Sequence, residues 1–428
     1  MMEDWIECRI DQAFKTVTGN TPSKKESGNY GSLVPFIKPP QISNKIIGDA
    51  YEYLSDKGKL KARILPPNSV LVTCIGNLGR VGINKVEVAF NQQINALLPV
   101  DFVIPKLMFY QCQSIKFRSQ LEKLSTSTTV ALVNKGSFNS VSISLPPLPI
   151  QRAIVSKIES LFSSLDNGIA DLKKAQEQLK IYRQAVYAST LTWENLTPIS
   201  DLVNNLSQGW SPKCINQNSS DPNQWAVIKT SAIQSGRFIE YENKILPETL
   251  EPREQHEIIK DDILITRAGP RVRVGICCLV KKTRPKLINC DKVYRLKLKK
   301  EKIIPQYFEY ALNSPVALSK IEKMKTGSSD SGLNLTQKIF LKLEIPFPDL
   351  SEQKILIREI ESRLSVCDKV EENIKNSLIK AKALRQSILK KAFEGKLLTA
   401  VEIEKCKQEA DYEPASVLLE RIKKEKKK

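Results

Sequence analysis

Two short loops combine arginine with glycine directly after apolar runs that are typical of β-strands. The first is Cys74–Arg80, which includes Asn77, and the second is Arg267–Arg273, which includes Arg271. Glycine lets a backbone approach a phosphate, and a guanidinium forms paired hydrogen bonds with a phosphate or with guanine O6 and N7. The loops therefore predict contacts with a polyanion such as a nucleic acid, with ordinary turn chemistry as the alternative.

Basic, hydroxyl and amide side chains form further sets that recur in the two halves of the chain. Lys38 and Lys229 each end an apolar run, and hydroxyl residues gather at 125–129 and 325–332. Hydroxyls suit phosphate contacts, and the amide of Gln92 suits adenine. The full set of candidate nucleic-acid contacts is Lys38, Asn77, Arg80, Gln92, Thr126, Thr128, Ser211, Lys213, Lys229, Arg267, Arg271, Arg273, Lys325 and Ser328.

The sequence shows no pattern typical of catalysis. It lacks the G-x-x-x-x-G-K-[ST] loop of nucleotide-binding proteins, and Gly76–Arg80 matches no dinucleotide fingerprint. The single histidine, His256, lies in a polar stretch, which argues against a histidine-dependent nucleophile and a Cys/His zinc site. We expect no catalytic residue, no metal site and no enzymatic activity in this chain.

The distribution of charge favours the same kind of partner. The 428 residues carry a formal net charge of +19. Most of the excess lies in residues 1–147 and 197–347, whose net charges are +6 and +8. A polyanionic partner is the simplest reason for this distribution, and solubility is the alternative.

Several features predict a cytoplasmic protein without a membrane partner. No apolar run approaches the roughly 18–20 residues that span a bilayer. The start of the chain, Met1–Trp5, has neither the basic nor the apolar region of a signal peptide. The nine cysteines include no CxxC motif, and we interpret them as reduced thiols.

Short β-type runs, separated by glycine and proline, fill residues 1–147 and 197–347. The runs match between the two segments with a growing offset: Thr18–Pro22 with Gln208–Pro212, Phe36–Lys38 with Val227–Lys229, Val81–Ile83 with Val274–Ile276, and Ile104–Pro105 with Ile304–Pro305. Small insertions between matched positions predict one fold that carries different loops.

A long helical segment of about 45 residues follows each β-rich segment, so each helix is roughly 65–70 Å long. Apolar residues recur at every seventh position: Ile158, Leu165, Leu172, Leu179 and Val186 in the first, and Ile360, Cys367, Ile374, Ala381 and Ile388 in the second. A second seam is assigned to Leu161, Ala175 and Tyr182, interrupted at Gly168, and to Val370 and Leu384. The pattern predicts an intramolecular antiparallel coiled coil. Packing of each helix on its own globular segment is the alternative.

The two helical segments begin in similar ways. Each follows prolines and contains a glutamine in its first turns, Gln151 or Gln353, and an Arg-Gln pair follows in both near the end. The second segment is expected to have two more residues before its glutamine, which would make the helices asymmetric.

With these helix starts, the Arg-Gln pairs and the twofold repeat, the chain resembles the specificity subunit (HsdS) of type I restriction–modification systems. The resemblance covers essentially the whole length, including the C-terminal segments Ala392–Leu397 and Glu413–Ile422. It implies an α+β protein with two similar target recognition domains and two long helices that form an antiparallel coiled coil with a pseudo-twofold repeat. The implied domains are 1–147 and 197–347 for recognition, 148–196 and 348–398 for the helical spacers, and 399–428 for a basic tail.

The resemblance also implies a function and a set of partners. Each recognition domain would read one half of a bipartite, asymmetric target in double-stranded DNA, and the helices would set the spacer and dock two methyltransferase subunits. S-adenosylmethionine, ATP and Mg would bind to those subunits and to restriction/translocase subunits, and this chain would hold none of them. A coiled-coil scaffold that binds nucleic acid or protein without sequence specificity is the alternative.

Overall fold

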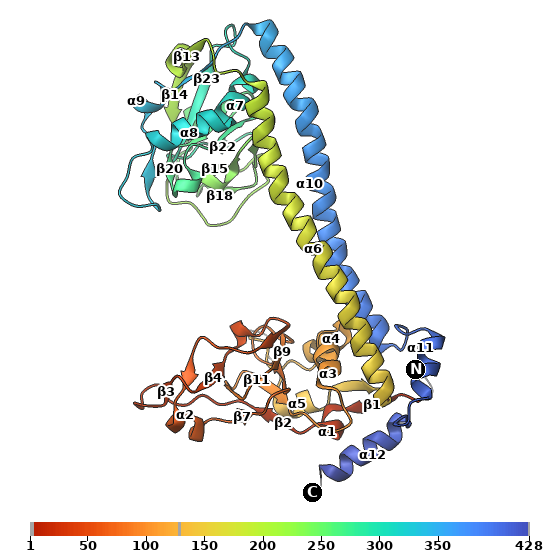
Figure 1. The fold of residues 1–428 in the computed structure, drawn as a ribbon. Helices are drawn as coiled ribbons and strands as arrows, with labels where there is room; N and C mark the ends of the chain where they lie inside the picture. Colours follow the sequence, from red (N-terminus) through yellow and green to blue (C-terminus); the bar gives the residue numbers. More distant parts are fainter. Residues whose placement is uncertain (1–3, 127–129, 427–428) are drawn as a thin grey trace. The chain divides into compact units, whose positions relative to one another are not determined.

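The computed structural model describes residues 4–126 and 130–426, and these residues form two compact units. The first unit comprises Met1–Leu172 and Asn376–Lys428, and the second comprises Lys173–Lys375. Each unit contains a globular lobe and parts of two long helices (Figure 1). Lobe 1 runs from Ile6 to Leu145, and lobe 2 runs from Leu196 to Pro346.

Lobe 1 combines two five-stranded sheets with short helices. Its strands are β1 (Ile6–Arg9), β2 (Thr16–Thr18), β3 (Tyr30–Gly31), β4 (Val34–Ile37), β5 (Lys45–Ile47), β6 (Tyr53–Leu54), β7 (Ile64–Leu65), β8 (Val70–Thr73), β9 (Val81–Asn84), β10 (Val88–Phe90), β11 (Ile94–Leu97) and β12 (Ser142–Leu145). Its helices are α1 (Ile10–Ala13), α2 (Asp56–Lys61), α3 (Pro105–Cys112), α4 (Ile115–Lys123) and α5 (Lys135–Asn139). The sheet orders are β2-β11-β8-β9-β5 and β3-β6-β4-β10-β7, and β1 pairs with β12.

Lobe 2 repeats this arrangement. Its strands are β13 (Leu196–Pro198), β14 (Val203–Gln208), β15 (Ala226–Ile228), β16 (Ile233–Gln234), β17 (Arg237–Phe238), β18 (Asn243–Ile245), β19 (Ile263–Thr266), β20 (Ala268–Gly269), β21 (Cys277–Leu279), β22 (Leu287–Ile288), β23 (Val293–Leu298), β24 (Leu333–Asn334) and β25 (Glu344–Pro346). Its helices are α7 (Pro305–Asn313), α8 (Pro315–Met324) and α9 (Gln337–Phe340). The order β14-β23-β19-β21 reproduces β2-β11-β8-β9, and β18-β15-β22 reproduces β6-β4-β10.

The central strands β8 and β19 are buried along their whole length, which explains their apolar runs. Every residue of β8 and of β19 is buried. Such strands bury side chains on both faces, so they read as continuous Val/Ile/Leu segments rather than as an alternating pattern. The predicted repeat of one α/β fold with different loops is confirmed by the strand orders that the two lobes share.

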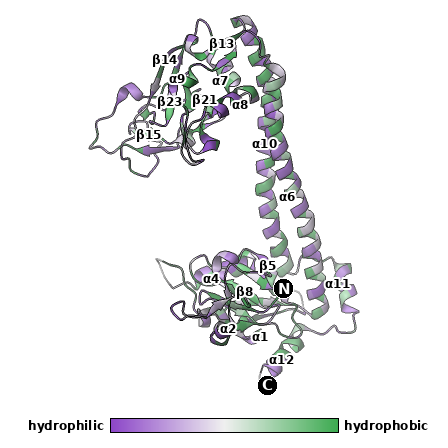
Figure 2. Cartoon of the chain, turned by 60° about the vertical axis from the view of Figure 1, so that its left-hand side comes forward, coloured by the Kyte–Doolittle hydropathy of each residue, from purple (hydrophilic) through white to green (hydrophobic). Residues whose placement is uncertain are grey.

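The two long helices are α6 (Leu148–Thr190) and α10 (Leu350–Phe393). Hydrophobic and hydrophilic residues alternate along both of them (Figure 2). In the first unit the start of α6 packs on the end of α10, through Ile158 and Ile388 among others. In the second unit Val186, near the end of α6, packs with Ile360, near the start of α10. The predicted antiparallel pairing is therefore confirmed, and α6 continues unbroken through Gly168.

The predicted first seam is buried or half-buried, but the predicted second seam is wrong at three positions. Tyr182, Val370 and Leu384 are exposed. The second seam instead runs through residues that are buried or half-buried: Val155, Phe162, Ile169 and Arg183 in α6, and Ile357, Leu364, Leu378 and Arg385 in α10. Two arginines, together with Gln176 and Glu371, interrupt its apolar pattern, which is why the heptad reading selected the wrong stripe.

Those two arginines make equivalent ion pairs across the helix pair, one in each unit. Arg183 Nη2 lies 2.6 Å from Asp368 Oδ1. Arg385, which is 202 positions after Arg183, pairs with Asp166 in the other unit. The Arg385 guanidinium also lies 4.2 Å from the ring centroid of Phe162, a cation–π contact. The seam therefore tolerates arginine because each one has an acidic partner on the opposite helix.

Gln151 and Gln353 fix the helix starts to their lobes through the same hydrogen bonds. Both glutamines are fully buried. Oε1 accepts from the N–H of Ile104 at 2.9 Å in the first unit, and from that of Ile304 at 2.8 Å in the second. Nε2 donates to two backbone carbonyls in each unit: those of Phe102 and Pro146, and those of Lys302 and Pro348.

These contacts overturn the expected asymmetry of the helix starts. Gln151 and Gln353 are each the fourth residue of their helix, because α6 begins at Leu148 and α10 at Leu350. The second helix therefore has no additional residues before its glutamine. The sequence misled because only Pro146 and Pro348 occupy equivalent positions, whereas Pro147 and Pro149 of the first segment are matched by Asp349 and Ser351 in the second.

The C-terminal segment folds onto lobe 1 as two helices, α11 (Ala400–Lys407) and α12 (Ala415–Glu425). Leu418, Leu419 and Ile422 of α12 are buried in the same core as residues of α1. Arg152 forms ion pairs with Glu409 and Asp411. Among residues 4–126 and 130–426, no helix combines the length and apolarity that a membrane span requires.

Candidate nucleic-acid interface

In each lobe the arginine-containing loop lies beside the hydroxyl-containing loop. In lobe 2 the two are joined by strands, because β20 pairs antiparallel with β24. In lobe 1 a single bridge between Ile75 and Leu132 joins the corresponding segments. Two of the three regions selected from the sequence are thus brought together in both lobes, and we call the first segment of each pair the arginine loop.

A fully buried threonine anchors each arginine loop: Thr73 in lobe 1 and Thr266 in lobe 2. The Thr73 hydroxyl donates to the carbonyl of Asn77 at 2.5 Å and accepts from the N–H of Arg80 at 3.0 Å. The Thr266 hydroxyl donates to the carbonyl of Arg273 and accepts from the N–H of Ile276. The same local device therefore closes both loops.

The anchors correct the register that the sequence suggested. Gly79 donates its N–H to the Thr73 carbonyl, and Gly275 donates to the Thr266 carbonyl, so these two glycines are equivalent. Both lie at positive φ, 73° and 89°, a conformation that favours glycine. The predicted match of Gly82 with Gly275 is wrong, because Gly82 lies within β9 and Gly275 lies in the turn. The short motif Val-Gly-Ile surrounds both glycines and suggested the wrong register.

The lobe 2 loop contains three additional residues. Cys74 and Arg267 are equivalent because they make the same backbone hydrogen bonds. The N–H of Cys74 donates to the connection between β10 and β11, and the N–H of Arg267 donates to the connection between β22 and β23. The carbonyl of each residue accepts from the facing loop. Between Gly269 and Arg273 lie Pro270, Arg271 and Val272, which have no counterpart between Gly76 and Asn77. The lobes therefore share an anchored loop but differ in its length and tip.

The predicted arginines of lobe 2 are engaged within the protein. Arg271 pairs with Glu322, and its Nε lies 2.9 Å from Asp330 Oδ1. These hydrogen bonds raise the pKa of Arg271 above its usual value. Arg273 Nη2 donates to the carbonyls of residues 230 and 233, at 2.5 and 2.7 Å. Their charged groups therefore hold the loop in place.

Two more predicted cations also have protein partners. Lys325 Nζ lies 2.6 Å from Glu322 Oε2 and donates to the carbonyl of Arg271. Arg267 Nε donates to the carbonyl of Asp291 at 2.7 Å, and its guanidinium lies over the ring of Tyr294. The arginine loop of lobe 2 is consequently tied to α8, to the facing loop and to the segment that leads into the β16–β17 hairpin.

The arginine loop of lobe 1 presents free polar groups instead. Asn77 and Arg80 are exposed. Within the part of the chain that the structure describes, neither side chain has a hydrogen-bond or ion-pair partner. Lys213 of lobe 2 is similarly exposed. These residues have side chains available for an external ligand.

Lys38 and Lys229 occupy equivalent positions after β4 and β15, and each faces a glutamate that the sequence analysis missed. Lys38 Nζ lies 2.7 Å from Glu52 Oε1, and Lys229 Nζ lies 3.7 Å from Glu242 Oε2. The hydrogen bond from Lys38 is the main cause that lowers the pKa of Glu52. The sequence does contain a signal for this pairing. Each glutamate immediately precedes the strand that pairs with the strand before the lysine.

A hydroxyl contact is also repeated between the lobes. Thr21 donates to Gln92 Oε1 at 2.6 Å. In lobe 2 Ser211 donates to Asp291, which the sequence analysis did not select. Gln92 and Ser211 are both exposed, so the two predicted residues belong to one recurring surface feature.

The hydroxyl loops share a threonine at their second position, Thr126 or Thr326. Thr126 donates its N–H to the carbonyl of Leu132 at 3.1 Å, and Thr326 donates to that of Asn334 at 2.8 Å. Thr126 and Ser328 are exposed. Thr128 lies outside the described residues.

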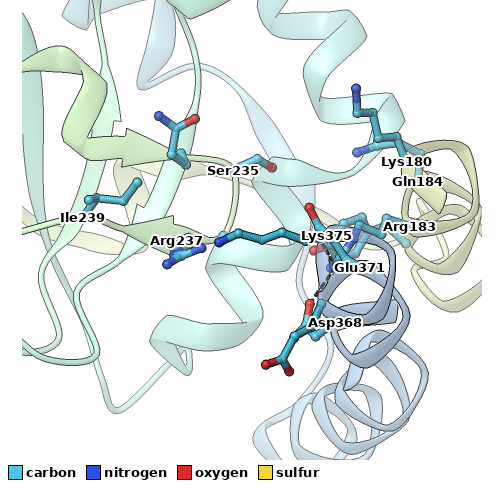
Figure 3. Close-up of a pocket in the computed structure, with 13 residues that line it drawn as sticks. Lys180, Arg183, Gln184, Ser235, Arg237, Ile239, Asp368, Glu371 and Lys375 are labelled. Carbon is cyan, nitrogen blue, oxygen red and sulfur yellow. Dashed lines mark hydrogen bonds and ion pairs between the residues drawn. The ribbon is translucent and has the colours of Figure 1, made fainter. Parts of the chain in front are cut away.

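A cleft of about 880 Å³ in the second unit was not predicted. Its lining comes from α6, from the β16–β17 hairpin and from α10 (Figure 3). Lys180 and Lys375 contribute amino groups, and Arg183 lies beside Asp368 and Glu371 (Figure 3). Because charges of both signs line it, the cleft resembles a polar protein contact more than a phosphate site.

Comparison with solved structures places this fold in one class. A chain described under "Structural basis underlying complex assembly and conformational transition of the type I R-M system" superposes with a TM-score of 0.69 at 17% identity, covering 92% of this chain and 99% of that one. The HsdS subunit from Thermoanaerobacter tengcongensis gives a TM-score of 0.52 at 16% identity, covering 93% of this chain and 98% of that one. The fold is therefore that of two-lobed specificity subunits.

The family follows from sequence. The model for the type I restriction modification DNA specificity domain matches twice, at residues 2–179 and 192–380. The chain belongs to this family. The Escherichia coli K12 EcoKI specificity subunit is 25% identical over 99% of this chain and 96% of its own length. The Escherichia coli EcoEI specificity subunit is 38% identical, over 42% of this chain and 30% of its own length.

Proposed function

We propose that this chain is the DNA-specificity subunit of a type I restriction–modification complex, in which each lobe reads one half of a bipartite, asymmetric target. The observation that carries the proposal is the pair of arginine loops. Buried Thr73 and Thr266 anchor them in the same way, but the loops differ in length and in exposed chemistry. A shared scaffold with different tips is what two different half-sites require.

Charge supports DNA as the ligand. The chain has a net charge of +19. Exposed Arg80 and Lys213 are available for phosphate contacts, which supply much of the affinity for duplex DNA and make it depend on salt. The remaining candidate residues are proposed to shape the loops as well as to contact DNA.

The reactions are proposed to belong to partner subunits. Methyltransferase subunits would bind S-adenosylmethionine, and restriction/translocase subunits would use ATP and Mg. Flipping a base out of the duplex for methylation is also assigned to the methyltransferase. This chain would contribute target recognition and assembly, and no catalytic group of its own.

The outward faces of the long helices are the proposed docking surfaces for two methyltransferase subunits, and the helix pair is proposed to set the spacer. Tyr182 and Leu384 occupy equivalent positions and are each 51% exposed. Lys180 and Lys382, one turn or less away, are exposed as well. Apolar side chains at matched exposed positions suit two copies of one partner.

An exchange of lobe 1 tests the proposal. The purified complex with its methyltransferase selects duplexes from a random library, and residues 1–147 are then replaced by the equivalent domain of a relative. One half of the selected sequence should change while the other half and the spacer remain. A change in both halves, or in neither, would contradict the assignment of one half-site to each lobe.

The family assignment favours this function over a scaffold that binds nucleic acid without sequence preference. The two differ in one measurement. A scaffold would bind scrambled and selected duplexes equally, and its affinity would fall with salt as phosphate contacts alone require. A specificity subunit retains a preference for the selected duplex at every salt concentration.

A further inference from the structure

We infer that Val272, at the tip of the three-residue insertion in the lobe 2 arginine loop, recognises the 5-methyl group of a thymine in the target. The inference rests on the proposed function, which makes duplex DNA the ligand of lobe 2. It adds the chemical group that this loop reads and the residue that reads it.

The insertion is rigid, which a base-reading residue requires. Arg271 donates its backbone N–H to the Asp330 carbonyl at 2.8 Å, and its side chain pairs with Asp330 and Glu322. On the other side of Val272, Arg273 is tied to two backbone carbonyls of residues 230 and 233. Both neighbours of the valine are thus held, so its side chain is presented in a fixed position.

All three inserted residues, Pro270, Arg271 and Val272, are exposed. The Val272 side chain is 80% exposed, the highest value among the large apolar residues of lobe 2 in the described part of the chain. The two flanking arginines turn their guanidinium groups onto acidic or carbonyl oxygens of the protein. Val272 therefore presents an isopropyl group to a ligand at the tip.

An isopropyl group has one specific partner on the edge of a base pair. It cannot form a hydrogen bond, and the thymine 5-methyl is the apolar group that DNA displays in the major groove. Contact between the two removes apolar surface from water on both sides. The net charge of +8 over residues 197–347 favours the approach of the surrounding phosphates.

The arginine loop of lobe 1 offers the opposite chemistry. It lacks the insertion, and its exposed side chains are Asn77 and Arg80, which are hydrogen-bonding groups. The lobes therefore differ at the same structural position, one with an apolar tip and the other with a polar tip. Two unlike half-sites are the expected consequence.

Replacing thymine by deoxyuridine removes only the methyl group, so it isolates the proposed contact. The complex with its methyltransferase is titrated with the selected target by fluorescence anisotropy, and each thymine is replaced by deoxyuridine in turn. We expect one replacement to weaken wild-type binding about fourfold, the effect of losing one buried methyl group. Val272→Ser should weaken binding of the normal target to a similar degree and abolish the effect of that replacement.

The matched control is Ile259→Ser. Ile259 is also exposed, but it precedes β19, whereas the arginine loop follows β19, so it lies at the other end of that strand. Its substitution should leave every affinity unchanged.

Three results would overturn the assignment: a target half-site of G·C pairs alone, no wild-type response to any deoxyuridine, or additive losses for Val272→Ser and deoxyuridine. If the wild-type complex preferred no sequence at all, the proposed function itself would fail, which is a separate result.

Discussion

Removing the buried glutamine at the start of α6 should loosen the first unit and leave the second unit unchanged. Gln151→Leu keeps the volume of the side chain but removes three hydrogen bonds. It leaves the N–H of Ile104 and the carbonyls of Phe102 and Pro146 without their partner. An orphaned buried group costs about 1–3 kcal/mol, so the three together should cost at least about 3 kcal/mol.

Hydrogen exchange measured by mass spectrometry reports this loss for each unit separately. A cost of about 3 kcal/mol corresponds to about 150-fold faster opening. Amides of α3 and of the first turns of α6 should exchange faster by about that factor in Gln151→Leu, while amides of α7 remain protected. Gln353→Leu is the reciprocal control and should affect α7 and the start of α10 alone.

The reasoning would be refuted by a change of less than about threefold at α3 in Gln151→Leu, since a side chain worth so little cannot anchor the helix. Equal acceleration of α3 and α7 would also refute it. That result would mean that the two anchors are not independent.

Three further predictions follow from contacts within the units. The double variant Arg271→Ala, Arg273→Ala should weaken binding of the selected DNA at least several-fold in a fluorescence titration, because the loop loses its ties; unchanged affinity would remove the loop from the interface. Leu418→Ala should lower the free energy of unfolding of the first unit, measured by urea titration, by about 3 kcal/mol. Val417→Ala, at an exposed position of the same helix, should lower it by less than about 0.5 kcal/mol. Equal effects would argue that α12 does not complete the lobe 1 core. Burial raises the pKa of Glu309 to about 7 from its usual value of 4.5, so the folded second unit binds a proton that the unfolded chain loses. The stability of the second unit should therefore fall as pH rises from about 5 to 8. Glu309→Gln should flatten that dependence, and an unchanged pH profile in the variant would contradict the prediction.

The parts of the fold that a simple period encodes could be predicted from the sequence. The seam through Ile360, Cys367 and Ile374 is buried as its spacing indicates. The central strands were recognisable because both of their faces are apolar, as in β8. The family resemblance was recognisable because the helix starts at Gln151 and Gln353 and the Arg-Gln pairs recur in both halves of the chain.

The parts that depend on tertiary contacts could not be predicted in the same way. Arg183 and Arg385 lie in a helix seam because an aspartate on the opposite helix pairs with each, and no local pattern shows that partner. The register of the arginine loops is set by buried hydroxyl anchors, whereas the sequence match followed a short motif. Glu52 was missed because its ion-pair partner, Lys38, lies 14 positions earlier in the chain and comes near it only in the folded lobe.

The central claim is that this chain directs modification to a bipartite DNA sequence, and mapping methylated bases across a genome tests it most directly. Cells that express this chain together with its methyltransferase subunit are compared with cells that express the methyltransferase alone. The account predicts a split, asymmetric adenine-methylated motif that is present only when the chain is present. An identical methylation pattern in both cells, with the chain shown to be assembled on the methyltransferase, would contradict it.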